Sequence, residues 1–279
     1  MTPGRPTLLG EDMFTASDHT FVVCAYKENP YIVETIKSLR SQTASGGGVI
    51  LSTSTPNDYL RSVCSSFDIP MVINPSPHLA GDDWNYGYDS AGTRLVTLAH
   101  QDDLYEPTFL ECVLDAFNRR GDGSELISFT DYYEIREGRV VDDNAILRVK
   151  RVMNWPLRFG LVNGRPWLKK RILSFGDSIC CPAVTFVREN VGPSPFDTTY
   201  VNSCDYKTWV DLARRPGGFL YVPRPLMGHR IYAESATSRN LEDDIRKGED
   251  LEILSSLWPR PVARAVNRLY SLSEKSNAL

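Results

Sequence analysis

Short apolar runs that alternate with amphipathic segments are the feature that most constrains how this chain folds. Four such runs, at residues 21–26, 49–51, 71–73 and 95–99, are separated by stretches whose apolar residues recur at helical spacing. A run of this length that is apolar throughout is typical of a strand buried on both faces. Strands that alternate with helices indicate an α/β fold with a mostly parallel, mixed central sheet flanked by helices.

Local signals suggest where the elements begin and end. Asn29 and Thr55 each precede a proline, which predicts a helix cap followed by a first-turn proline. Gly138 is expected to lie in the turn of a hairpin. A strand is predicted at residues 219–222, ending at the two prolines that follow it, and a polar loop is predicted at residues 229–240.

Two adjacent carboxylates, Asp102 and Asp103, follow the fourth apolar run. Ligands of open α/β sheets gather outside the carboxyl ends of the strands. Hard cations such as Mg²⁺ and Mn²⁺ prefer carboxylate oxygens and leave coordination positions for substrate phosphates. The pair therefore indicates a site for a metal and a diphosphate. For an acidic pair considered alone, a solvated turn is the alternative.

Composition narrows the class of protein. The formal charge of −4, from 31 basic and 35 acidic residues, disfavours general nucleic-acid binding. The sequence has neither a secretory leader nor an apolar run of about 20 residues, so a cytoplasmic protein without a transmembrane segment is expected. Six cysteines without CxxC spacing and four histidines without an HExxH motif disfavour a zinc hydrolase.

Residues 144–177 are rich in basic and aromatic side chains. One interpretation is a surface that faces phosphates, a membrane or an acceptor. The other, which we favour, is an amphipathic helical region whose long basic stems cover apolar surface.

Three segments, in order, resemble glycosyltransferase family 2, whose members have the GT-A fold. The first is the strand and loop VVCAYKENP at residues 22–30. The second is WNYGY at residues 84–88 followed by HQDD at residues 100–103, and the third is CDYKTW at residues 204–209. Each motif is short, but their order and their placement on strands and helices make the combination specific. The resemblance covers about residues 20–240.

The resemblance implies transfer of a sugar, with inversion, from a nucleotide-diphosphate donor to an acceptor hydroxyl in carbohydrate biosynthesis. Asp205 would be the general base, and Asp102 would hold Mg²⁺ or Mn²⁺. His100 stands where the family commonly has its first metal-binding carboxylate, which leaves Asp102 as the better metal-ligand candidate and Asp103 as a supporting or structural acid. Residues assigned to the donor and its nucleotide are Ala25, Tyr26, Glu28, Asp82, Asp83, Asp103, His229 and Arg230. For Asp82 and Asp83, solvated positions at a helix start are the alternative.

The expected organisation is an irregular arm at residues 1–19, one catalytic domain at residues 20–240 and C-terminal helices at residues 241–279. The nucleotide-binding half would cover about residues 20–130 and the acceptor-side half about residues 131–240. Expected partners are a nucleotide-sugar donor and a carbohydrate, lipid-linked or small-molecule acceptor, and not nucleic acid. A homodimer and a peripheral position at the membrane stay open. Alternative functions are a nucleotidyltransferase or nucleotide-sugar hydrolase, and a non-catalytic nucleotide-sugar-binding protein.

Overall fold

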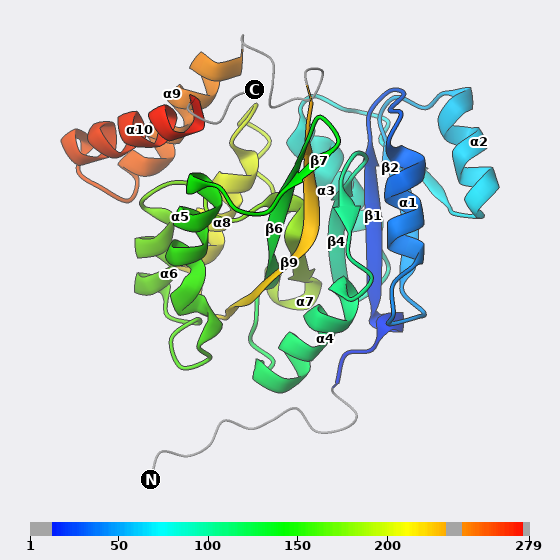
Figure 1. Cartoon of the computed structure of the whole chain (residues 1–279), viewed down its shortest axis with the longest axis horizontal. Helices are drawn as coiled ribbons and strands as arrows, with labels where there is room; N and C mark the ends of the chain where they lie inside the picture. Colours follow the sequence, from blue (N-terminus) through cyan, green and yellow to red (C-terminus); the bar gives the residue numbers. More distant parts are fainter. Residues whose placement is uncertain (1–12, 233–241, 276–279) are drawn as a thin grey trace.

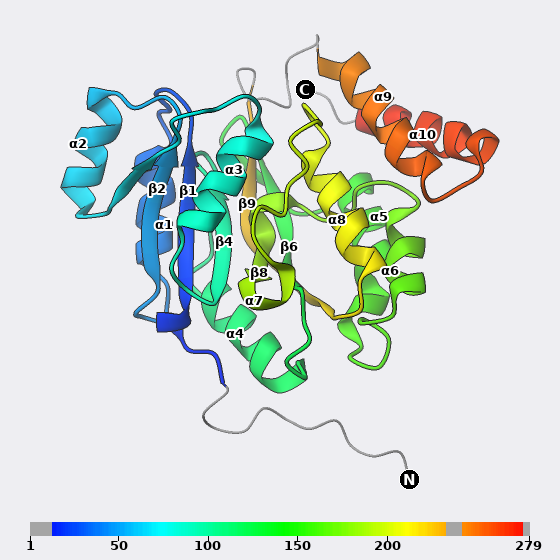
Figure 2. The same ribbon diagram turned by 180° about the vertical axis from the view of Figure 1, so that it is seen from behind.

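The computed structural model describes residues 13–232 and 242–275. In this part of the chain a nine-stranded mixed sheet lies between helices on both of its faces (Figures 1 and 2). The strand order is β3-β2-β1-β4-β8-β6-β9-β5, and β7 pairs with β6. The strands are β1 (His19–Ala25), β2 (Gly48–Thr53), β3 (Met71–Ile73), β4 (Leu95–His100), β5 (Leu104–Tyr105), β6 (Ile127–Arg136), β7 (Arg139–Val141), β8 (Val184–Val187) and β9 (Phe219–Ile231).

The helices alternate with the first strands and then follow one another more closely. They are α1 (Ile32–Arg40), α2 (Asp58–Phe67), α3 (Ala80–Ser90), α4 (Phe109–Arg120), α5 (Ala145–Asn154), α6 (Pro166–Leu173), α7 (Arg188–Val191), α8 (Cys204–Arg214), α9 (Glu242–Ser255) and α10 (Arg260–Lys275). Short 3₁₀ helices are η1 (Ala16–Asp18), η2 (Trp155–Arg158) and η3 (Cys181–Ala183). The prediction of an α/β fold with a mixed sheet is confirmed. Within the described residues, no helix has the length and apolar character needed to cross a membrane.

Strands β1 to β4 form the parallel part of the sheet, as the alternation predicted. β1 pairs in parallel with both β2 and β4, and β2 pairs in parallel with β3. Successive residues of β1 enter different cores, because side chains alternate across a strand. Phe21 and Val23 pack in the core with Ile36 of α1, whereas Val22 packs in the core with Tyr88 of α3. The apolar run is continuous because both faces of the strand are covered.

Two predicted helix starts are wrong by a few residues. Asn57, and not Thr55, caps α2, because its side chain accepts the backbone N–H of Leu60 at 2.8 Å. Asn29 lies before α1 and accepts the backbone N–H of Tyr31 at 2.8 Å, and Tyr31 occupies the cap position. In both cases the cap lies two residues after the predicted position.

The second half of the sheet mixes strand directions. β8 is antiparallel to both β4 and β6, and β6 and β7 form the predicted hairpin. Its turn has positive φ at Glu137 (47°) and at Gly138 (77°), which suits the twist of a tight hairpin.

Strand β9 is much longer than predicted and corrects two expectations. It passes through Pro223 and Pro225, and it includes His229 and Arg230, which the sequence suggested were in a loop. β9 runs parallel to β6, and the pairing shifts register around Asp131, opposite the prolines. The irregularity accommodates residues that have no N–H to donate. The remainder of the predicted loop, at residues 233–240, lies outside the described residues.

The basic stretch is helical, as predicted, and forms α5, η2 and α6. The division of the two C-terminal helices near Trp258 is also found, between α9 and α10. Of the predicted arm, residues 1–12 lie outside the described residues, and Phe14 is buried against Phe117 of α4. The division into an arm, two halves and C-terminal helices stays a prediction.

Candidate functional site

The carboxyl ends of the four parallel strands meet at one edge of the sheet. Tyr26 follows β1, Ser54 follows β2, Asn74 follows β3, and Asp102 follows β4. Parallel strands place these positions side by side, because their pairing registers align β1 with β2 and β4. This edge is where open α/β sheets bind ligands.

Asp102 is tied to residues from other parts of the chain. Its Oδ2 accepts a hydrogen bond from the hydroxyl of Tyr232 at 2.8 Å, and its main-chain oxygen accepts one from Nε of Arg230 at 2.8 Å. Burial raises the pKa of the Asp102 carboxyl, and the charge of neighbouring Asp103 raises it further. A nearby positive charge would therefore stabilise the ionised form of the Asp102 carboxyl.

Asp103 is the fully buried member of the acidic pair. Its side chain is fully buried, and its Oδ1 accepts from Nδ1 of His229 at 3.1 Å and from the backbone N–H of Arg230 at 2.9 Å. Burial opposes ionisation, but the charge and hydrogen bond of His229 lower the pKa of the Asp103 carboxyl below its ordinary value. Although buried, His229 has a raised pKa, chiefly because of Asp103. These two contacts connect Asp103 to β9.

The pairing of β5 with β9 creates this arrangement. Leu104 lies opposite Gly228, so the residues before Leu104 meet the residues after Gly228. The guanidinium of Arg230 then reaches Glu34 of α1 at 2.8 Å and lies 4.0 Å from the centre of the Tyr31 ring. Arg230 thus connects β9 to α1 beside the strand edge.

Sequence reasoning missed Tyr232. Its hydroxyl contacts Asp102 and also accepts a hydrogen bond from Nδ2 of Asn29 at 3.0 Å, and its ring lies 5.3 Å from that of Tyr31. The residue was within the predicted loop, and no local pattern relates it to a carboxylate 130 positions earlier.

His100 is at the end of β4, between the acidic pair and α3. Its ring stacks on Trp84 with 5.1 Å between centroids, and its Nδ1 lies 3.8 Å from Oδ2 of Asp103. Its Nε2 is buried without a hydrogen-bond partner among the described residues. The charge of His100 lowers the pKa of both Asp102 and Asp205, so this imidazole lies within electrostatic range of both carboxylates.

The loop after β1 contains the residues assigned to the nucleotide. Ala25 is buried, whereas Tyr26 and Glu28 are exposed. Gln101, a residue not identified from the sequence, accepts from the Tyr26 N–H at 3.0 Å and donates to the Tyr26 carbonyl at 3.2 Å. Lys27 has a positive φ of 59°, and its N–H is bonded to the hydroxyl of Thr55. This loop is therefore fixed to β4 and to the end of β2, with the Tyr26 side chain left free of the core.

The two carboxylates at the start of α3 are not equivalent. Asp82 accepts the backbone N–H of Leu79 at 2.9 Å, which is a helix-start contact. Asp83 accepts from Oγ of Ser54 at 2.6 Å and from Nδ2 of Asn74 at 2.8 Å. Asp83 thereby supplies an acidic group at the ends of β2 and β3, where the β2 exit has none before Asp58.

Asp205 lies in the first turn of α8, where a carboxylate is favoured by the free helix amides. Its Oδ1 accepts the backbone N–H of Tyr206 at 2.8 Å. Burial raises the pKa of its carboxyl, and the charge of Arg246 is the largest opposing influence. A raised pKa suits a group that must take up a proton near neutral pH.

Two further ionisable groups, which sequence reasoning missed, lie near Asp205. Burial raises the pKa of Asp177 to about 8, and the charge of Asp205 raises it as well. Burial opposes the charged form of Lys150, but Tyr132, Tyr270 and Asp177 raise the pKa of its ammonium well above its ordinary value. These groups make the side of the site facing α5 and α10 strongly polar.

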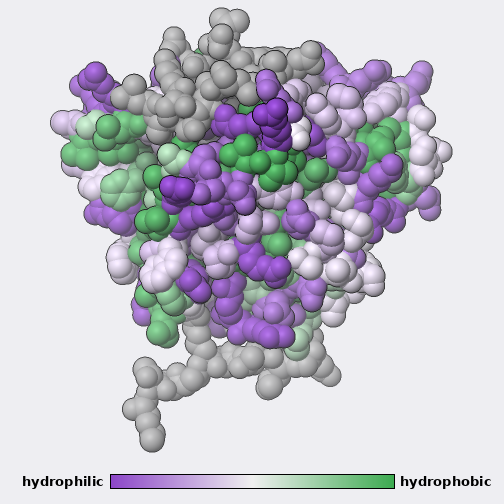
Figure 3. Space-filling view, viewed as in Figure 1, coloured by the Kyte–Doolittle hydropathy of each residue, from purple (hydrophilic) through white to green (hydrophobic). Residues whose placement is uncertain are grey.

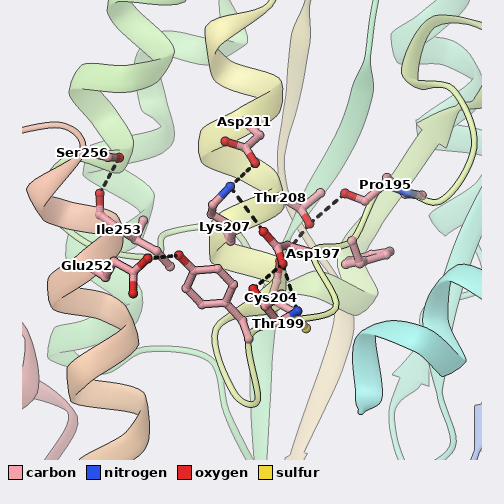
Figure 4. A network of polar contacts seen from close by, with 12 residues as sticks. Pro195, Asp197, Thr199, Cys204, Lys207, Thr208, Asp211, Glu252, Ile253 and Ser256 are labelled. Carbon is pink, nitrogen blue, oxygen red and sulfur yellow. Dashed lines mark hydrogen bonds and ion pairs between the residues drawn. The ribbon is translucent and has the colours of Figure 1, made fainter. Parts of the chain in front are cut away.

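The loop before α8 is held by a polar network (Figure 4). Lys207 bridges Asp211 on its own helix and Asp197 in the loop, the latter at 3.6 Å. Thr208 donates to the carbonyl of Pro195 at 3.2 Å. On the other side, the Glu249 carboxylate of α9 accepts three successive backbone N–H groups of residues 201–203. The start of α8, and with it Asp205, is thus fixed from two directions.

The carboxylates at the strand edge are compatible with a metal ion that binds together with a phosphate-bearing ligand. Within residues 13–232 and 242–275, no group of three or more His, Cys, Asp or Glu side chains is arranged to hold a metal ion. Oδ1 of Asp103 accepts from His229 and Arg230 and its side chain is fully buried, whereas Asp102 is half-buried at the strand edge. Mg²⁺ is often bound through one or two carboxylates together with substrate phosphates and water, so a single Asp is compatible with a metal and a diphosphate that bind together.

Comparisons with known proteins bear on the fold and the family of this chain. Among curated protein sequences, none matches the chain. Among solved structures, Staphylococcus aureus TarS has a TM-score of 0.56 at 12% identity, and the match covers 89% of this chain and 42% of TarS. TarS 1-349 in complex with UDP-GlcNAc has a TM-score of 0.59 at 12% identity, covering 90% of this chain and 70% of that one.

A mannosyltransferase from Pyrobaculum calidifontis, PcManGT, solved with GDP-Man and Mn²⁺, has a TM-score of 0.58 at 14% identity. That match covers 96% of this chain and 79% of PcManGT. The chain therefore has the GT-A fold. The sequence model described as "Glycosyl transferase family 2" matches residues 20–173, more than half of the chain. The chain belongs to glycosyl transferase family 2.

Proposed function

We propose that this protein transfers a sugar from a nucleotide-diphosphate donor to an acceptor hydroxyl, with inversion at the anomeric carbon and with Asp205 as the general base. The observation that carries the proposal is that His100, at the end of β4, lies within electrostatic range of two carboxylates, Asp102 and Asp205. Its charge acts both on Asp102 at the strand edge and on Asp205 at the start of α8. One site therefore has a carboxylate for the donor side and a second carboxylate for the acceptor side.

On the donor side, the strand edge offers groups suited to a nucleotide diphosphate. Tyr26 has an exposed ring beside the end of β1, and Asp83 is held at the ends of β2 and β3 as a hydrogen-bond acceptor for ribose or base. His229 and Arg230, fixed by Asp103, present positive charge beside Asp102. Mg²⁺ or Mn²⁺ held by Asp102 would neutralise charge on the diphosphate. The complexes of PcManGT with GDP-Man and Mn²⁺ and of TarS with UDP-GlcNAc support a donor of this class.

On the acceptor side, Asp205 accepts the proton of the attacking hydroxyl. The hydroxyl oxygen forms a bond to the anomeric carbon as the bond from that carbon to the diphosphate oxygen breaks. The nucleoside diphosphate leaves on the opposite face, so the configuration inverts. The raised pKa of Asp205 supports this role, because a base is most effective when its pKa approaches the working pH.

Product analysis tests the reaction. The protein is incubated with a panel of nucleotide sugars and either Mn²⁺ or Mg²⁺, with and without carbohydrate, lipid-linked and small-molecule acceptors. Transfer predicts release of nucleoside diphosphate that depends on the acceptor. Release of pyrophosphate would instead identify a nucleotidyltransferase, release without an acceptor a hydrolase, and donor binding without turnover a binding protein.

The role of Asp205 has its own test. Asp205→Asn should lower the rate of transfer by about 10²-fold or more while the dissociation constant of the donor stays unchanged. Asp58→Asn is the matched control, since Asp58 is also a carboxylate in the first turn of a helix, but is exposed on α2. Unchanged turnover in Asp205→Asn would refute the assignment of the base.

A further inference from the structure

One surface segment has a charge opposite to that of the whole chain. Residues 144–176 contain no acidic residue and eight basic ones, in a protein with a net charge of −4. The segment forms α5, η2 and α6, which lie together at the end of the molecule away from α2 (Figure 1). Its basic residues are Arg148, Lys150, Arg151, Arg158, Arg165, Lys169, Lys170 and Arg171.

Half of these basic groups have structural partners. Lys169 donates to the carbonyls of Arg215 and Gly217, Arg151 pairs with Asp131, Arg148 pairs with Asp143, and Lys150 lies over the ring of Tyr132. The other four side chains are exposed, and none forms an ion pair with a carboxylate in the part of the chain that the structure describes, although the guanidinium of Arg171 lies 4.2 Å from the centre of the Trp258 ring. They are Arg158, Arg165, Lys170 and Arg171.

The same segment exposes an unusual number of large apolar side chains. Of the fifteen exposed large apolar residues in the described chain, seven lie between residues 149 and 175. Leu161 is 82% exposed, Trp167 is 64% exposed and Trp155 is 52% exposed. The seven are Val149, Val152, Trp155, Phe159, Leu161, Trp167 and Phe175. Figure 3 shows hydrophobic and hydrophilic residues intermixed over the side of the molecule where Figure 1 places α5 and α6.

Aromatic and basic side chains lie next to one another in and beside η2. The rings of Trp155 and Phe159 meet edge to face at 4.8 Å, and the guanidinium of Arg158 lies 5.8 Å and 5.5 Å from their centres. Trp is the residue most suited to the boundary between water and lipid, and Arg beside it can contact lipid phosphates. Val149 and Val152 add aliphatic surface on the preceding helix α5.

We propose that the exposed basic and apolar residues of α5, η2 and α6 form a surface that binds membranes containing anionic phospholipids. The positive charge of this surface favours anionic lipid over a second copy of the chain. A second copy of the same surface would bring like charges together, which is unfavourable. A lipid surface can receive the aliphatic and aromatic side chains in its boundary region while its phosphates pair with the four exposed cations. The inference does not depend on the reaction catalysed.

Vesicle sedimentation with the full chain tests the proposal. Binding is compared between vesicles of phosphatidylcholine alone and vesicles that also contain phosphatidylglycerol, at low and at high salt. We expect binding to the anionic vesicles, and we expect it to be weaker but still measurable at high salt, because screening reduces the electrostatic attraction and leaves the apolar contribution. Arg158→Glu should lower the partition coefficient by about fivefold or more, the value of one basic residue near an anionic surface. Trp155→Ser should weaken binding at both salt concentrations.

Control substitutions lie on the far side of the molecule. Arg61→Glu on α2 makes the same charge change, and Ile73→Ser on β3 removes an apolar side chain that is 37% exposed. Both should leave binding unchanged, and the thermal unfolding of every variant is measured to confirm folding. Absence of wild-type binding to anionic vesicles, equal binding to both compositions, or equal effects of Arg158→Glu and Arg61→Glu would each overturn the proposal. The proposal would also be overturned if the protein did not bind vesicles and light scattering instead detected a dimer that Trp155→Ser dissociates.

Discussion

The hydroxyl of Tyr232 donates a hydrogen bond of 2.8 Å to Oδ2 of Asp102. The same hydroxyl accepts from Asn29, so one phenol connects the loop after β1, the end of β4 and the end of β9. This contact occupies an oxygen of the carboxylate that we assign to the cation. A cation bound at Oδ2 would compete with the Tyr232 proton for this oxygen.

Removal of this hydroxyl should strengthen cation-dependent binding of a nucleoside diphosphate. Tyr232→Phe frees Oδ2 of Asp102, and a hydrogen bond to a charged group contributes about 1.5–3 kcal/mol, so affinity should rise by about tenfold or more. Titration calorimetry with UDP or GDP and Mn²⁺ measures the change. Tyr31→Phe is the control, because its ring adjoins Tyr232 at 5.3 Å but no contact of its hydroxyl with Asp102 is found. Weaker binding in Tyr232→Phe would mean that the phenol itself holds the donor.

The pH profile of transfer should have an acid limb, in which the rate falls as pH decreases. The midpoint of this limb should lie above the ordinary aspartate pKa of about 3.9. Burial raises the pKa of Asp205, and only its deprotonated form can accept the acceptor's proton, so activity falls as pH drops through this raised pKa. A profile of kcat/KM from pH 4 to pH 8 locates the limb. His100→Gln should move the limb to higher pH, because the charge of His100 lowers the pKa of Asp205.

The exposed His78 provides the control for that experiment. His78→Gln is expected to leave the profile unchanged, since His78 lies in the loop before α3 and is not among the groups acting on Asp205. A shift of the limb to lower pH in His100→Gln would contradict the proposed electrostatic link.

The pair of Asp103 and His229 should stabilise the fold in a defined pH window. The pKa of Asp103 is lowered, so its contribution is present above about pH 3.9 and lost in acid. The pKa of His229 is raised, so its contribution is complete below about pH 6.5 and is lost as pH rises through the higher folded value. Asp103→Asn should therefore lower the free energy of unfolding by about 1.5–3 kcal/mol near pH 5.5 and by less near pH 9.

Urea unfolding of wild type and Asp103→Asn at several pH values measures this difference. Asp115→Asn is the matched control, because Asp115 forms an exposed ion pair with Arg119 at 3.0 Å. Its substitution should cost only about 0.3–0.5 kcal/mol. A loss in Asp103→Asn that is the same at pH 5.5 and pH 9 would contradict the role of His229.

Gly87 should be intolerant of a side chain, because α3 packs closely on the sheet there. A Cβ at Gly87 would lie 2.9 Å from Cγ1 of Val22 and 3.0 Å from Cβ of Ser52. Alanine gains about 1 kcal/mol of helix propensity over glycine, but overpacking costs about 1–3 kcal/mol, so Gly87→Ala should be destabilising on balance. Gly248→Ala in α9, where a Cβ meets nothing within 4 Å, should instead stabilise by about 1 kcal/mol. Thermal unfolding distinguishes the two, and a stabilised Gly87→Ala would disprove the close packing.

The sequence by itself determined the parallel half of the sheet and the position of Asp102. Both follow from short-range patterns, since an apolar run defines a strand and the order of strands and helices defines the edge where ligands bind. The first turn of α8, which contains Asp205, also follows from local signals, because helical spacing and a carboxylate at the start of the helix are visible within ten residues.

Only the tertiary structure decided how these carboxylates are used. The contacts of Asp103 with His229 and of Asp102 with Tyr232 join residues 126 and 130 positions apart. They depend on the register of β5 on β9, and β9 itself continues through Pro223 and Pro225, which local rules place outside a strand. The physical reason is that pairing with β6 and an irregularity beside Asp131 outweigh the local preference. Short-range patterns show which residues carry charge, and the pairing of distant strands decides which of them meet.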